Sequence, residues 1–240
     1  MPLVRGRCIM DDRRIVLPGV MAGLLLSATA FAFSPLLMPD SYSWIAHTLS
    51  QAAAQGQEGG WLSRLGFLLA GLTILRLTSP DVVDWMPLAR HVHRLTGALV
   101  LAAMAFTDRS WDATAPYDRV ENIIHSAVAT SIAISFSVGV LVVLYEKQVM
   151  TGRVPLLESV VVAVQIAMPP MMLAWVEGTG IIERVMFGAA FIWYGWEVLR
   201  CAGLVGARER SVKSAEPAAS RYLGLELRRV LHIRPRGEVR

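Results

Sequence analysis

Charged residues are scarce in this chain of 240 residues, of which only 18% are Asp, Glu, Lys or Arg while 54% are apolar. Soluble domains carry about 25% charged residues, so this composition argues against an ordinary soluble domain. The positive mean hydropathy of +0.48 points the same way. We therefore expect an all-α integral membrane protein, because helices satisfy their own backbone groups in hydrocarbon.

Cysteine is also scarce. The chain has two, Cys8 and Cys201, and the topology derived below places both on the cytoplasmic side, where thiols stay reduced. This excludes a disulfide framework and a zinc site built from cysteine.

Long polar stretches are missing from most of the chain, and six apolar stretches approach the roughly 20 residues that a membrane-spanning helix needs. They are approximately Ile15–Met38, Trp61–Thr78, Leu88–Thr107, Ile123–Tyr145, Val154–Val176 and Ile181–Leu204. The third is the weakest, because it includes the polar run from Arg90 to Arg94. The sequence thus predicts a six-transmembrane-helix bundle.

Lysine and arginine are absent from the long segment 34–60. With both termini in the cytoplasm, 17 of the 23 basic residues fall on inner segments, as the positive-inside rule requires. This predicts a basic N-terminus (1–14), a transmembrane domain (15–204) and a basic cytoplasmic tail (205–240). A cleaved signal peptide at the first span is the alternative, but its removal would put the basic tail on the wrong side.

The tail has leucine and valine at the spacing of a short amphipathic helix, between Leu223 and Leu231. Such a helix would lie on the anionic inner leaflet, and the alternative is a partly disordered basic tail. No aromatic interleaving or fold motif indicates nucleic-acid binding.

Polar residues gather at the predicted outer ends of the spans, and three chemistries fit them. Ser50 could be a nucleophile with His47 or His125 as its base and Asp108 as the residue that orients the base. Those two histidines and Asp108 could instead bind zinc, although we expect no cofactor. His47 and Ser50 would share one face if this segment is helical.

A third chemistry involves two arginines placed against the positive-inside trend. "GWLSRLGF" and "GIIERVMF" each start with glycine and carry arginine four residues later, as Arg64 and Arg184. Two guanidinium groups could clamp an anionic lipid headgroup. The plainer alternatives are snorkelling to the headgroups, pairing with nearby carboxylates and, for the histidines and Asp108, interhelical hydrogen bonds.

Three further groups of residues are expected to serve packing or to lie at the cytoplasmic side of the membrane. His91 and His93 lie at the inner end of the third span, away from the outer cluster. Pro169 and Pro170 are expected to interrupt the fifth span. In the last span, Glu197 is expected to pair with Arg200, one helical turn further along.

Several motifs together resemble a known family. They are "SYSWIAHTLSQAAAQGQEGGWLSRLGFLLAGL", "RHVHRLTGAL", "DRSWD", "IIHSAVA" and "GTGIIERVMFGAAFIWYGW". This set is similar to the domain-of-unknown-function 998 family of bacterial membrane proteins, over about Leu17 to Leu204. The resemblance implies a six-pass protein of the bacterial plasma membrane, related to proteins of lipid organisation or membrane stress, and it implies no reaction. The stretch "SQAAAQGQ" departs from the family pattern after Ser50.

From these observations we expect the protein to bind a lipid headgroup or small amphiphile in an outer-facing polar pocket, with Arg64 and Arg184 as ligands. The first alternative is a membrane-embedded hydrolase that uses the serine, histidines and aspartate, with or without zinc. The second is a structural or transporter-associated subunit with a membrane-protein partner.

Overall fold

The computed structural model describes residues 4–205, with side chains from Val16 onward, and all regular structure in that range is helical. The long helices are α1 (Val4–Phe33), α3 (Trp61–Leu77), α4 (Pro87–Ala105), α5 (Arg119–Thr151), α6 (Leu156–Ala174) and α7 (Thr179–Cys201). The short ones are η1 (Ser34–Leu37), α2 (Leu49–Ala52), η2 (Glu58–Gly60) and η3 (Val176–Gly178). The predicted tail helix lies outside the described residues.

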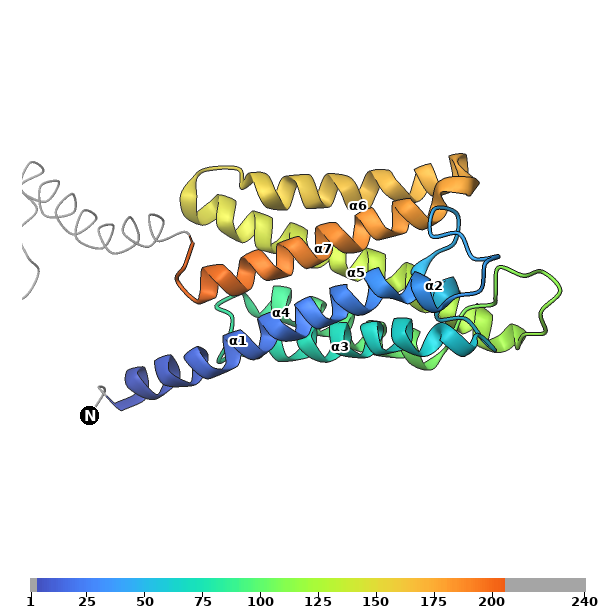
Figure 1. Ribbon diagram of the computed structural model, residues 1–240. Coiled ribbons are helices and arrows are strands. Elements are labelled where there is room, and N and C mark those ends of the chain that lie inside the picture. Colours follow the sequence, from blue (N-terminus) through green and yellow to red (C-terminus); the bar gives the residue numbers. More distant parts are fainter. Residues whose placement is uncertain (1–3, 206–240) are drawn as a thin grey trace, which may run out of the picture. The chain divides into compact units, whose positions relative to one another are not determined.

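The long helices run alternately up and down along one bundle (Figure 1). The α1–α3, α4–α5 and α6–α7 connections lie at one end, called the strap end because it holds residues 42–54, named the strap below. The α3–α4 and α5–α6 connections lie at the other end, called the Lys147 end because Lys147, near the end of α5, lies there. Helix α3 packs between α1 and α4, α4 against α5, and α6 against α7.

Capping residues explain where helix α5 begins and ends. Asp118 precedes α5, and its carboxylate accepts hydrogen bonds from the free backbone N–H groups of Val120 and Glu121. The helix stops at Gly152, which adopts φ 66°, a left-handed conformation that glycine takes without steric cost. Helix α5 therefore extends by about a turn or more beyond both predicted span ends.

The two adjacent prolines do not interrupt the fifth predicted span. Helix α6 continues through Pro169 and Pro170 to Ala174. The prolines therefore do not end the helix, while a kink at them stays a prediction.

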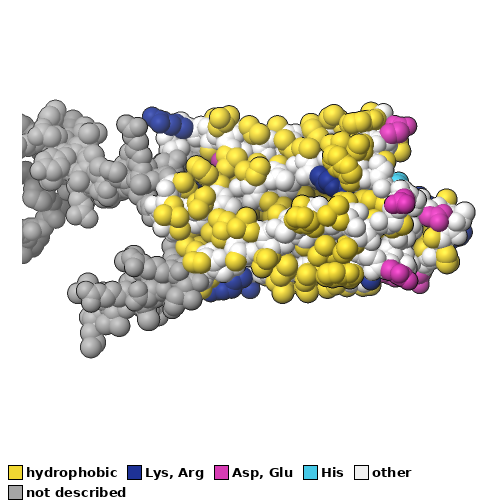
Figure 2. Space-filling view, viewed as in Figure 1, with side chains coloured by type: hydrophobic (Ala, Val, Ile, Leu, Met, Phe, Trp, Pro, Cys, Tyr) yellow, Lys and Arg dark blue, Asp and Glu magenta, His cyan; other side chains and the backbone are white. Residues whose placement is uncertain are grey.

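Apolar side chains cover the flank of the bundle, and Asp and Glu side chains gather at the strap end on the face that Figure 2 shows. Within the described residues, four segments are long and apolar enough to cross a membrane: Val16–Leu37, Glu58–Leu77, Arg119–Thr151 and Leu156–Ala174. Helices α4 and α7 are not among these segments. The chain is a helical membrane protein, while the count of six spans and their orientation stay predictions.

Candidate functional site

The segment 42–54, whose backbone is irregular apart from the short helix α2, lies across the start of α7, and we call it the strap. Arg184 of α7 holds its first part through backbone acceptors. The Nη1 group donates to the carbonyls of Trp44, His47 and Gly180, each at 2.9 Å. Its Nη2 donates to the Tyr42 hydroxyl at 2.8 Å. One guanidinium thus fixes a stretch of chain that has no regular secondary structure of its own.

Gly180 makes this contact sterically possible. A Cβ atom built there would lie 2.4 Å from the His47 carbonyl oxygen and 2.6 Å from that of Trp44. The next residue, Ile181, donates its backbone N–H to the Ile45 carbonyl at 3.1 Å. The first turn of α7 therefore supplies both the space and the donors for the strap.

The far end of the strap is held in the same way from α3. Arg64 donates from Nε to the Ala53 carbonyl at 3.0 Å and from Nη2 to the Ala54 carbonyl at 2.8 Å. A Cβ on Gly60 would lie 3.1 Å from the Ala52 carbonyl oxygen. The arginines of the two glycine-to-arginine patterns thus donate hydrogen bonds to opposite ends of the strap.

These contacts bear on the predicted role of the arginines as ligands. The hydrogen bonds of the Arg64 and Arg184 guanidiniums go to carbonyl oxygens of the protein and, for Arg184, to one hydroxyl, rather than to the carboxylates considered as pairing partners. These hydrogen bonds position the strap, and binding of an anionic group by either arginine stays a prediction. The sequence signal that could have revealed this role was the shared glycine-to-arginine spacing.

Under the strap, Glu183 joins the short helix α2 to α7. The backbone N–H of Leu49 donates to the Glu183 carboxylate, and the Ser50 hydroxyl donates to Glu183 Oε1 at 3.4 Å. Ser50 is buried. Glu183 is one of the nearby carboxylates that could pair with an arginine, and a carboxylate inside a predicted span is itself a signal of a site.

His125 and Asp108 lie near this pair. The His125 Nδ1 bonds to the Phe106 carbonyl at 2.7 Å, so Nδ1 carries the proton, while the buried Nε2 has no hydrogen-bond partner in the described chain. Burial raises the pKa of Asp108, and nearby His125 and Arg109 oppose that shift. Asp108 also interacts electrostatically with Glu183. The structure thus gathers Ser50, Asp108, His125 and Glu183, here called the polar cluster.

His47 belongs to the strap rather than to the polar cluster. Because α2 begins only at Leu49, after its N-cap Thr48, His47 and Ser50 do not share a helical face as we expected. The His47 Nδ1 accepts a hydrogen bond from the backbone N–H of Ser43 at 2.9 Å. Its ring stacks on Trp111 with a centroid distance of 5.3 Å, and burial lowers its pKa.

A metal centre receives no positive support from the described side chains. Among residues 16–205, no three His, Cys, Asp or Glu side chains are placed to hold a metal ion. The zinc alternative, with His47, Asp108 and His125 as ligands, stays an untested prediction.

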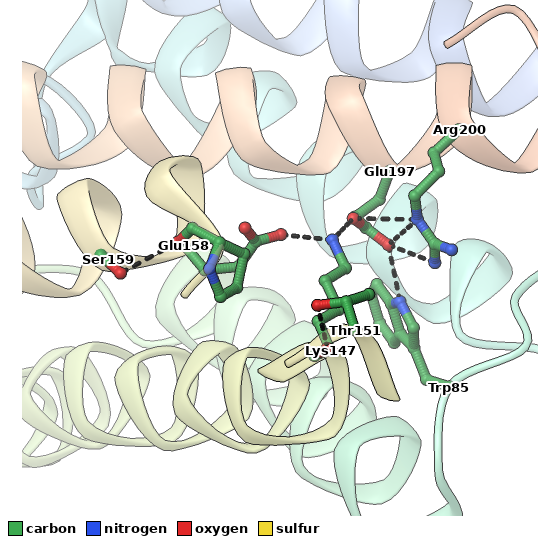
Figure 3. Close-up of polar contacts among 8 residues, drawn as sticks. Trp85, Lys147, Thr151, Glu158, Ser159, Glu197 and Arg200 are labelled. Carbon is green, nitrogen blue, oxygen red and sulfur yellow. Dashed lines mark hydrogen bonds and ion pairs between the residues drawn. The ribbon is translucent and has the colours of Figure 1, made fainter. Parts of the chain in front are cut away.

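A second polar group lies at the opposite end of the bundle (Figure 3). Lys147 of α5 bonds to the carboxylate of Glu158 on α6, and its Nζ lies 2.7 Å from Glu197 Oε1 on α7. Arg200 donates from Nη2 to Glu197 Oε2 at 2.8 Å, and the indole N–H of Trp85 donates to the same oxygen at 2.8 Å. The Glu197 side chain is fully buried.

This group, the Lys147 network, ties three helices and the α3–α4 connection together. The expected pairing of Glu197 with Arg200 is confirmed. The ion pair of Lys147 with Glu158 joins two different helices, so no spacing within one helix predicts it. Next to the network, His93 bonds to the Tyr194 hydroxyl at 3.0 Å, in keeping with its expected separation from the polar cluster.

Comparison with known proteins settles the family. Residues 21–200 match the model of a family described as "Protein of unknown function (DUF998)". The chain belongs to the DUF998 family. Neither a curated protein nor a solved structure matches the chain significantly. The DUF998 match covers the strap, the polar cluster and the Lys147 network, so all three lie within the family's domain.

Proposed function

We propose that this DUF998 protein binds the headgroup of a lipid or small amphiphile at the strap end, in the polar cluster. The observation that carries the proposal is His125, whose side chain is buried with 3% exposure and whose Nε2 lacks a partner in the described chain. A buried polar atom without a partner costs about 1–3 kcal/mol. A ligand that bonds to it would recover that cost.

The chemistry of the cluster favours a ligand that donates hydrogen bonds. Because Nδ1 of His125 donates its hydrogen bond to the Phe106 carbonyl, the Nε2 atom of the ring with a single proton is an acceptor. The carboxylates of Asp108 and Glu183 are acceptors when ionised. Hydroxyl and amine groups of a headgroup match this set, and Arg64 and Arg184 then serve by holding the strap.

Mass spectrometry of lipids that co-purify with the full chain tests this function. Either His125→Asn, which keeps a donor for Phe106 but removes Nε2, or Glu183→Gln should lower the bound amphiphile about tenfold, as expected for loss of a hydrogen bond to a charged or buried group. Ser126→Ala, one residue from His125 and exposed, is the control and should leave it unchanged.

The outcomes also distinguish binding in the polar cluster from binding of an anionic headgroup by the two arginines, Arg64 and Arg184. If Arg64→Gln and Arg184→Gln deplete an anionic lipid while the His125 and Glu183 variants do not, the arginine clamp is favoured. If no variant changes the bound amphiphile in folded protein, the binding function is rejected.

One contact supports a second candidate, a membrane-embedded hydrolase. The Ser50 hydroxyl already donates to Glu183 Oε1, so that carboxylate could accept the proton as Oγ attacks an ester carbonyl. The products of the two steps would be an acyl-serine with release of the alcohol, and then the free acid after attack by water. A fluorophosphonate probe should label the wild type and not Ser50→Ala; equal labelling of both would reject Ser50 as the nucleophile.

A further inference from the structure

The first two turns of α4, at the Lys147 end, present arginines that the bundle does not use. Arg94 is exposed and Arg90 is half-buried. Neither makes an ion pair or side-chain hydrogen bond with any residue in the described part of the chain. The nearby Arg76 contrasts with them, because its guanidinium bonds to Asp81 at 2.9 Å.

The exposed face of α4 changes character at these arginines. Leu88, His91, Arg94, Leu95 and Ala98 are exposed, and they recur at helical spacing on one face. From Leu95 onward that face is apolar, whereas the preceding turn carries histidine and arginine. Such a change marks the boundary between hydrocarbon and lipid headgroups on a helix that a bilayer surrounds.

We propose that Arg90 and Arg94 form a binding site for the phosphate of an anionic phospholipid at the Lys147 end of the bundle. Arg90 and Arg94 are four residues apart on α4, about one helical turn, and the planar donors of arginine match phosphate oxygens. Exposed Leu95 and Ala98, on the apolar side of the two arginines, would contact the acyl chains below the headgroup. This site is separate from the polar cluster and does not depend on its function.

Native mass spectrometry of the full chain with added phosphatidylglycerol or phosphatidylcholine tests the proposal. The wild type should retain phosphatidylglycerol in preference to phosphatidylcholine. Arg90→Gln/Arg94→Gln should lower the retained phosphatidylglycerol roughly 25-fold, since each of the two basic groups near a membrane surface contributes about a factor of five. Phosphatidylcholine retention should not change.

A charge-matched control distinguishes a site from general attraction. Arg228→Gln/Arg229→Gln removes the same two charges from the tail, outside the described residues. Retention that falls only for the α4 variant supports the site. Equal loss in both variants, or no loss in an α4 variant with wild-type thermal stability, overturns it.

Discussion

Lys147→Met is expected to destabilise the bundle by about 3–5 kcal/mol, the usual cost of removing one partner from a buried ion pair. The Lys147 side chain is 18% exposed, while those of Glu158 and Glu197 are 3% and 0% exposed. Without the ammonium, the buried carboxylate of Glu158 loses its ion pair. Unfolding in mixed micelles, followed by circular dichroism, measures the loss.

A second substitution tests the cause. In Lys147→Met/Glu158→Met the unpaired carboxylate of Glu158 is gone, and Glu197 keeps Arg200 and Trp85 as donors. The double variant should therefore be more stable than Lys147→Met alone. Arg153→Met removes an exposed basic side chain at the same end and should change stability by less than about 0.5 kcal/mol. A double variant as unstable as the single one would contradict this account of the network.

Gly180→Ala is expected to displace the strap and to cost about 1–3 kcal/mol, the range for an added methyl group in a packed site. The new Cβ would lie 2.4 Å from the His47 carbonyl oxygen. Because that atom belongs to the backbone, no rotation of a side chain relieves the clash. Unfolding measurements give the cost, and labelling of a cysteine placed at Ser43 reports on movement of the strap.

The chain offers a matched control on the same helix. Gly188 of α7 has no atom within 4 Å of the Cβ position, so Gly188→Ala should be neutral or stabilising by up to about 1 kcal/mol. Gly60→Ala should have a smaller effect than Gly180→Ala, since its nearest contact is 3.1 Å. Equal stability of the Gly180 and Gly188 variants would show that the strap adapts freely.

Arg184 should not tolerate lysine, although the charge is kept. Lysine presents one compact ammonium group, whereas the guanidinium reaches the carbonyls of Trp44 and His47 and the Tyr42 hydroxyl at once. Arg184→Lys should therefore free the strap to nearly the same extent as Arg184→Met. The labelling rate at Ser43→Cys measures this, and a rate close to that of wild type in the lysine variant would refute the geometric argument.

Much of the helical organisation could be predicted because hydropathy and capping are local. The apolar stretch beginning at Trp61 became α3, and the pairing of Glu197 with Arg200 followed from their spacing within one helix. The position of the strap could not be predicted in the same way. Arg184 lies 142 residues from its partner Tyr42, and no local pattern states which carbonyls a distant guanidinium will meet.

By itself, the sequence determined that the chain is apolar, helical and built for a membrane, because burial in hydrocarbon depends on composition along each segment. Only the tertiary structure decided which polar groups meet. It placed Glu183 with Ser50, put Lys147 between two carboxylates, and turned Arg64 and Arg184 toward the strap. The physical reason is that a polar group withdrawn from water must find a partner, and the fold alone decides which partners come within reach.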